Sequence, residues 1–141
     1  MSLNNLKIKI EYEMAQIEAE YSVIDSVKEC GVEGLNKIEI RAVASALHSI
    51  YNGIEKILMM VLKDRGITFI SDESWHSNIL KLSKENDIIS SDVKTRLREL
   101  MGFRHYFRHS YGFMLDNELM LPLYDNLASL LSDFKNEIMN K

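Results

Sequence analysis

The first 28 residues carry an apolar residue at every seventh position, and this regularity constrains the fold more than any other feature of the chain. The series consists of Leu3, Ile10, Ile17 and Ile24, with Met14 and Tyr21 between its members. Steps of three and four residues place all of these side chains on one face of an α-helix. The sequence therefore predicts one long amphipathic helix over residues 3–28 that packs against a neighbouring helix.

The second predicted helix is the main candidate for a core element. Gly31 and Gly34 end the first pattern, and Asn36 with Glu39 three residues later resembles a capping box. The helix then runs to about residues 65–66 and keeps apolar spacing of three and four for five turns. The apolar positions are Val43, Ala46, Leu47, Ile50, Ile54, Ile57, Leu58 and Val61. We expect it to pair antiparallel with the first helix.

Residues typical of helix N-termini predict three more helices. Residues 71–74 supply cap candidates and first-turn acids for a helix of about three turns that carries Trp75, Ile79, Leu80 and Leu82. Residues 90–92 start a fourth helix that ends near Gly112. Pro122 is a plausible first residue of a last helix. Nothing alternates with the period of two that strands show. The fold class is therefore all-α, a bundle of four longer helices and one short helix in a single domain over residues 1–141.

Several classes of protein are excluded by composition. The longest uninterrupted apolar run, residues 57–62, is too short to cross a membrane, and no secretory signal precedes the first helix. We therefore expect a cytoplasmic protein with no membrane partner. The single cysteine, Cys30, can form no internal disulfide, fits a reducing compartment and is a poor choice of nucleophile.

Charge is distributed unevenly along the chain. The formal net charge of −4 argues against a protein that coats nucleic acid indiscriminately. Residues 94–111, however, hold five cations and one anion, so this window carries +4 and the rest of the chain −8. The five cations are Lys94, Arg96, Arg98, Arg104 and Arg108, and the anion is Glu99. An acidic body therefore carries one basic stripe.

The fourth helix separates this basic stripe from the core. At about 100° per residue, its apolar residues fall on one arc, the core side. These residues are Leu97, Leu100, Phe103, Phe107 and Met114. The opposite arc holds Lys94, Arg98, His105, Arg108 and His109, with Arg104 and Tyr111 at its border. A solvated charged face accounts for Lys94 and Arg98, but less well for two arginines and two histidines within six residues.

These residue types suit phosphoryl chemistry. Arginine grips non-bridging phosphate oxygens with a fixed fork of donors, and histidine exchanges protons near neutral pH. A histidine here can take the proton of a ribose 2′-OH or return one to the leaving 5′-oxygen. Because residues 104–111 contain no Asp or Glu, a hard-metal site is disfavoured. The segment favours metal-independent RNA cleavage in which the 2′-OH of the RNA is the nucleophile.

Other interpretations of these polar residues were weighed. His105 and His109 have the spacing to chelate zinc, but there is no HExxH motif and no evident third ligand. The strip His48, Tyr51, Asn52 and Glu55 on the second helix is interpreted as a satisfied polar seam, with support of the arginines as the alternative. His76 is interpreted as a surface residue. Trp75, Met59 and Met60 are expected in the core.

The segment from Arg104 to Tyr111 reads R-x4-H-x-Y and resembles the signature of HEPN ribonucleases, specifically the HepT-like toxins. Residues 51–55, 75–76 and 103–113 also resemble a HepT-like branch, within a region of roughly residues 36–135. R-x4-H alone is a weak pattern. Its position late on the fourth helix of an all-helical chain makes it more specific.

The resemblance implies a HEPN-like bundle, a homodimer with the motifs facing a shared cleft, and metal-independent RNA cleavage without a cofactor. It also implies an antitoxin partner of the minimal nucleotidyltransferase type. By this match Arg104 and His109 are catalytic and Tyr111 is the regulatory tyrosine, a target for modification with AMP. His105 occupies the polar position after the arginine, and Arg108, outside the bare motif, is assigned a phosphate contact. Lys94 and Arg98 are expected to contact RNA.

Two function classes remain open at this stage. The first is an active endoribonuclease toxin, favoured because the arginine, the histidine and the tyrosine of the motif are all present. The second is a catalytically silent HEPN module that binds nucleic acid or a nucleotidyltransferase.

Overall fold

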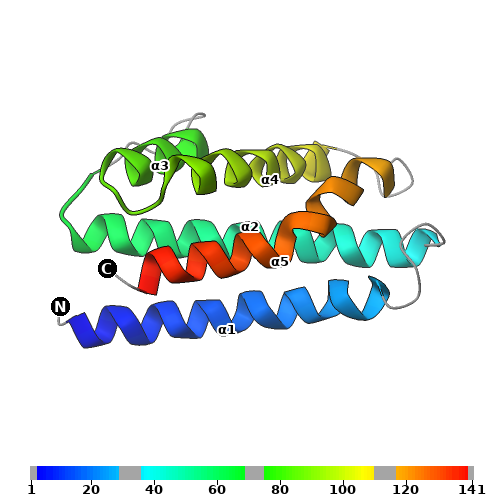
Figure 1. Ribbon diagram of the computed structural model, residues 1–141, viewed down its shortest axis with the longest axis horizontal. Helices are drawn as coiled ribbons and strands as arrows, with labels where there is room; N and C mark the ends of the chain where they lie inside the picture. Colours follow the sequence, from blue (N-terminus) through cyan, green and yellow to red (C-terminus); the bar gives the residue numbers. More distant parts are fainter. Residues whose placement is uncertain (1–2, 29–35, 69–74, 110–116, 140–141) are drawn as a thin grey trace.

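The computed structural model describes residues 3–28, 36–68, 75–109 and 117–139. Within these ranges the chain forms five helices and no strand: α1 Leu3–Lys28, α2 Lys37–Asp64, α3 Trp75–Glu85, α4 Ser91–His109 and α5 Asn117–Met139. Figure 1 shows α2 in the middle of the bundle, with α1 along one side and α3 and α4 along the other. The predicted all-α bundle of four longer helices and one short helix is confirmed.

α1 and α2 form the antiparallel pair that the periodicity predicts. Ile10, Met14, Ile17 and Ile24 of α1 are buried, and Tyr21 is partly buried against the core. α2 begins at the predicted capping box, in which Asn36 Oδ1 accepts from the Glu39 backbone N–H at 2.8 Å and Glu39 Oε1 accepts from the Asn36 N–H at 3.0 Å. Every apolar position predicted for α2 is buried.

Gly53 allows α1 and α2 to approach closely. A Cβ at this position would lie 2.7 Å from Ile17 Cγ1 and 3.1 Å from Ile17 Cδ1. Ile17 is 1% exposed, so its side chain has little space into which to move. The glycine therefore fixes the separation of the two helices at the centre of the bundle.

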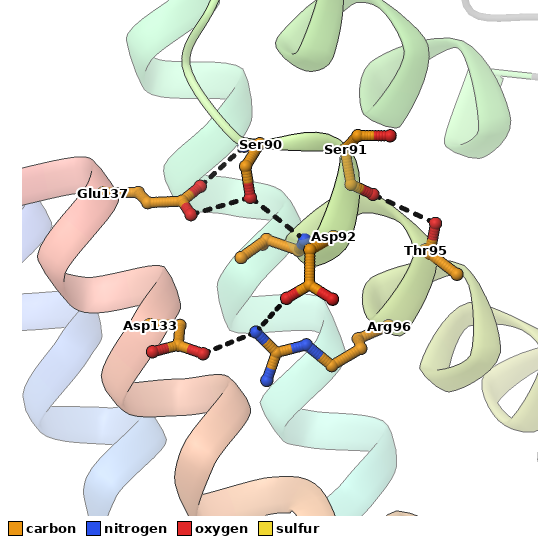
Figure 2. A network of polar contacts seen from close by, with 8 residues as sticks. Ser90, Ser91, Asp92, Thr95, Arg96, Asp133 and Glu137 are labelled. Atoms are coloured by element: carbon orange, nitrogen blue, oxygen red, sulfur yellow. Dashed lines mark hydrogen bonds and ion pairs between the residues drawn. The ribbon is translucent and has the colours of Figure 1, made fainter.

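α4 is joined to α5 by polar contacts at its N-terminal end (Figure 2). The Ser90 N–H and hydroxyl donate to the two oxygens of Glu137 at 2.6 and 2.8 Å, and Ser90 Oγ accepts from the Val93 N–H. Arg96 Nη2 donates to Asp92 at 2.6 Å and to Asp133 at 2.5 Å. The predicted start of α4 is confirmed, and α5 holds it in place.

The predicted start of the last helix is wrong. α5 begins at Asn117, so Pro122 lies inside the helix rather than at its first position. A proline in this place removes the hydrogen bond to the carbonyl four residues earlier and tends to bend the helix. Figure 1 shows α5 bent in its N-terminal part. The predicted caps at residues 71–74, Cys30 and the end of α4 near Gly112 lie outside the described residues.

Replacing Gly53 with alanine should destabilise the protein. Overpacking against Ile17 costs about 1–3 kcal/mol, whereas the better helix propensity of alanine returns only about 0.5–1 kcal/mol. We expect a net loss of about 1 kcal/mol in the free energy of unfolding, measured by urea denaturation.

Gly102→Ala on α4 is the matched control, because a Cβ at Gly102 meets nothing within 4 Å. This variant should gain about 0.5–1 kcal/mol. Equal effects of the two substitutions would show that the contact between Gly53 and Ile17 does not limit the helix separation.

Candidate functional site

Arg104 lies where α4 packs on α2. The core residues Leu97, Leu100 and Phe103 are buried and set the rotation of α4, as predicted, and Phe107 is partly buried. This rotation leaves Arg104 half-buried at the edge of the contact and His105 exposed one residue further on. The arginine is therefore held partly inside the protein, whereas its neighbour points to solvent.

A hydrogen bond from Arg104 Nε to Asn52 Oδ1, 2.7 Å long, joins α4 to α2. The bond occupies the Nε–H and leaves the two terminal nitrogens of the guanidinium outside this contact. Those nitrogens form one of the edges that binds two phosphate oxygens side by side. Asn52 therefore orients the guanidinium without adding a negative charge that would compete with a phosphate.

Asn52 is itself held by its neighbours. Its Nδ2 lies 3.5 Å from His48 Nδ1, one turn earlier on α2, and can donate to that nitrogen in the tautomer that leaves it unprotonated. The His48 ring packs against the Phe107 ring of α4, with centroids 4.9 Å apart and planes inclined by 38°. His48, Asn52, Arg104 and Phe107 thus form one cluster across the contact of α2 and α4.

A second polar cluster lies beside the first and reaches α3. Glu55 of α2 is only 4% exposed, and its Oε2 lies 2.7 Å from His76 Nδ1. Burial first, and then the negative charge of Glu55, raise the pKa of the buried Tyr51 hydroxyl, while the positive charge of Arg104 partly lowers it. Tyr51 therefore stays neutral at physiological pH. It lies close enough to both Glu55 and Arg104 for their charges to act on its hydroxyl.

Two interpretations made from the sequence, one of His76 and one of the α2 strip, change as a result. His76 is not a mere surface residue, because it forms an ion pair or a hydrogen bond with a buried carboxylate. The alternative interpretation of the strip, in which it supports an arginine, applies to Asn52, which accepts a hydrogen bond from Arg104. The signal available in the sequence was the four-residue spacing of His48 and Asn52, which places both side chains on one face of α2.

The other predicted site residues are placed as follows. Lys94 is half-buried, and Arg98 is exposed. Arg108 and His109 are the last two residues of α4, and their side chains lie outside the described part, as does all of Tyr111. The structure therefore joins Arg104 to α2, and the geometry between Arg104, His109 and Tyr111 stays a prediction.

Arg96 does not belong to the basic stripe in the way the charge count implies. It is held by Asp92 and Asp133, so its charge is balanced within the fold. Among the described side chains of α4, three other arginine and lysine residues could contact an anion outside the fold. They are Lys94, Arg98 and Arg104. Lys94 and Arg98 lie on the part of the helix that leads toward the motif, and Arg104 is the first residue of the motif.

No three His, Cys, Asp or Glu side chains in the described ranges lie close enough together to hold a metal ion. Among the helices as described, none is long and apolar enough to span a membrane.

Within the described residues, the chain is an all-helical bundle in which α2 supports a half-buried arginine of α4. Residues 42–140 match the family described as HepT-like protein, so the chain belongs to the HepT-like family. The matched region contains the polar strip of α2 and all of α3, α4 and α5, and it begins after α1. No curated protein and no solved structure gave a significant match.

Removing His76 should destabilise the protein more than removing the charge of its partner. His76→Ala leaves a buried carboxylate without its partner, which we expect to cost about 2–3 kcal/mol, since His76 is partly accessible to water. Glu55→Gln keeps the shape and removes the charge, so its cost should be smaller. Urea denaturation of both variants measures the difference.

The double variant Glu55→Gln, His76→Ala tests whether the two residues act together. Because the unpaired charge is gone, its loss of stability should be smaller than the sum of the single losses by at least about 0.5 kcal/mol. Additive losses would mean that the two side chains do not interact in solution.

Proposed function

We propose that this protein is a metal-independent endoribonuclease toxin that cleaves single-stranded RNA, and that its partner is a minimal nucleotidyltransferase antitoxin. Membership of the HepT-like family supports the class of protein. The observation that carries the proposal is the hydrogen bond between Arg104 and Asn52, which orients an arginine within the R-x4-H-x-Y segment. A cytoplasmic location follows from the RNA substrate.

In the proposed reaction the RNA supplies its own nucleophile. The 2′-OH loses a proton to a general base, and its oxygen attacks the adjacent phosphorus. The bond from phosphorus to the 5′-oxygen breaks, and that oxygen takes up a proton. The products are a 2′,3′-cyclic phosphate and a free 5′-hydroxyl. His109 carries the proton in one or both transfers, and Arg104 stabilises the charge that develops on the phosphate oxygens.

A homodimer accounts for the spacing of these two residues. α4 continues as an α-helix from Arg104 to His109, so the two positions are separated by about 140° of rotation and about 7.5 Å along the axis. One phosphate is difficult to reach from both positions of a single helix. A two-fold axis that brings two α4 helices together would set Arg104 of one copy opposite His109 of the other.

The remaining cations extend the site along the RNA. Arg98 and His105 are exposed on α4, and Lys94 is half-buried on the same helix. We assign Lys94, Arg98, His105 and Arg108 to contacts with phosphates beside the one that is cleaved. Such contacts contribute to affinity and to its dependence on salt, and little to the chemical step.

Cleavage of single-stranded RNA should proceed in the presence of a chelator and should depend on both motif residues. We expect His109→Ala to reduce kcat by about 10²–10⁴-fold and Arg104→Ala by about 10²–10³-fold. Asn52→Ala should reduce kcat by about tenfold with little change in KM, because it only misorients the guanidinium. Arg98→Ala should mainly raise KM and flatten the dependence of binding on salt. Gel analysis of a labelled RNA measures these rates.

The controls use the substrate and the dimer. An RNA with a single 2′-deoxy nucleotide at the cleavage position should be resistant. A mixture of Arg104→Ala and His109→Ala proteins should regain activity, because a mixed dimer holds one intact shared site. Cleavage by His109→Ala at the wild-type rate, or equal cleavage of the deoxy substrate, would contradict the mechanism.

Tyr111 should be the position at which the partner inactivates the enzyme. The partner would transfer AMP from ATP to the tyrosine hydroxyl, forming a phosphorus–oxygen bond and releasing pyrophosphate. Tyr111 follows Arg104 by seven residues, so if α4 continued it would return to within about 20° of the same face. The added phosphate would then occupy Arg104 and Arg108, and the adenosine would block access to RNA.

Mass spectrometry after co-expression with the partner tests this step. The tryptic peptide that contains Tyr111 should carry one or more AMP units, and Tyr111→Phe should carry none and stay toxic. If the partner protected cells from the Tyr111→Phe toxin as completely as from the wild-type toxin, and no adduct formed, binding alone would be shown to neutralise the toxin.

A further inference from the structure

α1 has two apolar faces, and the bundle uses only one of them. The inner face consists of the buried residues Ile10, Met14, Ile17 and Ile24. At about 100° per residue, a second apolar series lies on the opposite side of the helix. The outer series consists of Ile8, Tyr12, Ala15, Ala19 and Val23, all of which are exposed. We call these five residues the outer face of α1.

The exposure of this face is concentrated rather than scattered. Among the described residues, four large apolar side chains are exposed, and three of them belong to the outer face: Ile8 at 63%, Tyr12 at 64% and Val23 at 41%. Single exposed apolar residues are normal on protein surfaces, but an aligned series is not. Figure 1 shows α1 at the edge of the bundle, with α2 and α5 on its inner side.

Acidic residues line one edge of the outer face at the spacing that helix pairing requires. Glu11, Glu18 and Asp25 follow one another at intervals of seven residues. Glu18 also forms a solvent-exposed ion pair with Lys135 of α5, 3.2 Å long, which contributes little in water. The small side chains of Ala15 and Ala19 at the centre of the face permit another helix to approach closely. Ile8, Tyr12, Ala15 and Ala19 keep the alternating four- and three-residue spacing of a coiled-coil helix, with acidic flanking positions.

The charges argue against a second copy of α1 as the occupant. In an antiparallel pair with the apolar residues in contact, Glu11 of one copy would face Asp25 of the other, and the two Glu18 residues would face each other. In a parallel pair, Glu11 would face Gln16 and Glu18 would face Val23, so no ion pair would form. Neither arrangement places a cation opposite Glu11, Glu18 or Asp25.

We propose that the outer face of α1 binds an amphipathic helix of a partner protein that carries lysine or arginine at seven-residue intervals beside an apolar series. The apolar residues of that helix would cover Ile8, Tyr12 and Val23, and its cations would lie along Glu11, Glu18 and Asp25. The proposal is independent of RNA cleavage, because it uses no residue of the candidate site. It concerns a helix that lies outside the region matched to the HepT-like family.

Two synthetic helical peptides provide the test. Both carry leucine and alanine at the apolar heptad positions, and one has lysine at the flanking positions where the other has glutamate. The full-length protein should bind the lysine peptide at least tenfold more tightly, as measured by fluorescence anisotropy. Raising the salt concentration should reduce the difference in affinity between the two peptides. Equal affinity for the two peptides, or no binding of the lysine peptide, would overturn the proposal.

Variants locate the binding surface. Tyr12→Glu should weaken binding of the lysine peptide at least tenfold, whereas Ile38→Glu, at the fourth exposed apolar residue, should leave it unchanged because Ile38 lies on α2. Glu11→Lys and, separately, Asp25→Lys should each shift the preference toward the glutamate peptide, and Glu85→Lys on α3 is the matched charge control for each. Equal effects at control and test positions would overturn the proposal.

Two further readouts separate the alternatives. Self-association that Tyr12→Glu abolishes would identify a second copy as the occupant and would overturn the choice of a basic partner helix. Tyr12→Glu should cleave RNA at the wild-type rate, so a failure of helix binding and a failure of the proposed ribonuclease activity are observed separately.

Discussion

One turn of α2 determines the positions of three other helices. Gly53 sets the approach of α1 through Ile17, Asn52 accepts the hydrogen bond from Arg104 of α4, and Glu55 pairs with His76 of α3. Successive residues of a helix differ in direction by about 100°, so these positions face three different neighbours. Because α2 is buried along most of its length, a shift of its register would break all three contacts at once.

The polar contacts matter for position more than for net stability. The large apolar core supplies most of the free energy of folding, and an average hydrogen bond adds only about 1 kcal/mol. Apolar contacts alone, however, tolerate repacking, whereas a hydrogen bond or an ion pair requires particular atoms at particular distances. α4 has such contacts at both ends, with Glu137 and Asp133 of α5 near its start and with Asn52 near its end. These contacts within the fold thereby fix the position of Arg104.

The sequence predicts those parts of the structure that depend on local spacing. The apolar period gives α1 and α2 and the core side of α4, and the Asn36 capping box marks a helix start with the correct residue. Pro122 misleads because α5 begins five residues earlier, at Asn117, and accommodates the proline inside the helix with a bend. Contacts between distant residues are beyond such patterns. The partner of Arg104 lies 52 positions away, and His76 looks like a surface residue until α3 is seen against Glu55.

The bundle separates the candidate site from the outer face of α1. Figure 1 shows α1 and α4 on opposite sides of α2, so a helix bound to the outer face of α1 would not cover Arg104. A partner held there would leave the guanidinium accessible to RNA, and docking by itself would not stop cleavage. Lasting inhibition by such a partner would then require a change at the site itself. The AMP group proposed for Tyr111 would meet this requirement, because it would remain attached after the partner had dissociated. If the partner helix belonged to the proposed antitoxin, attachment at one surface and modification at another would allow one antitoxin molecule to act on several molecules of this protein in turn.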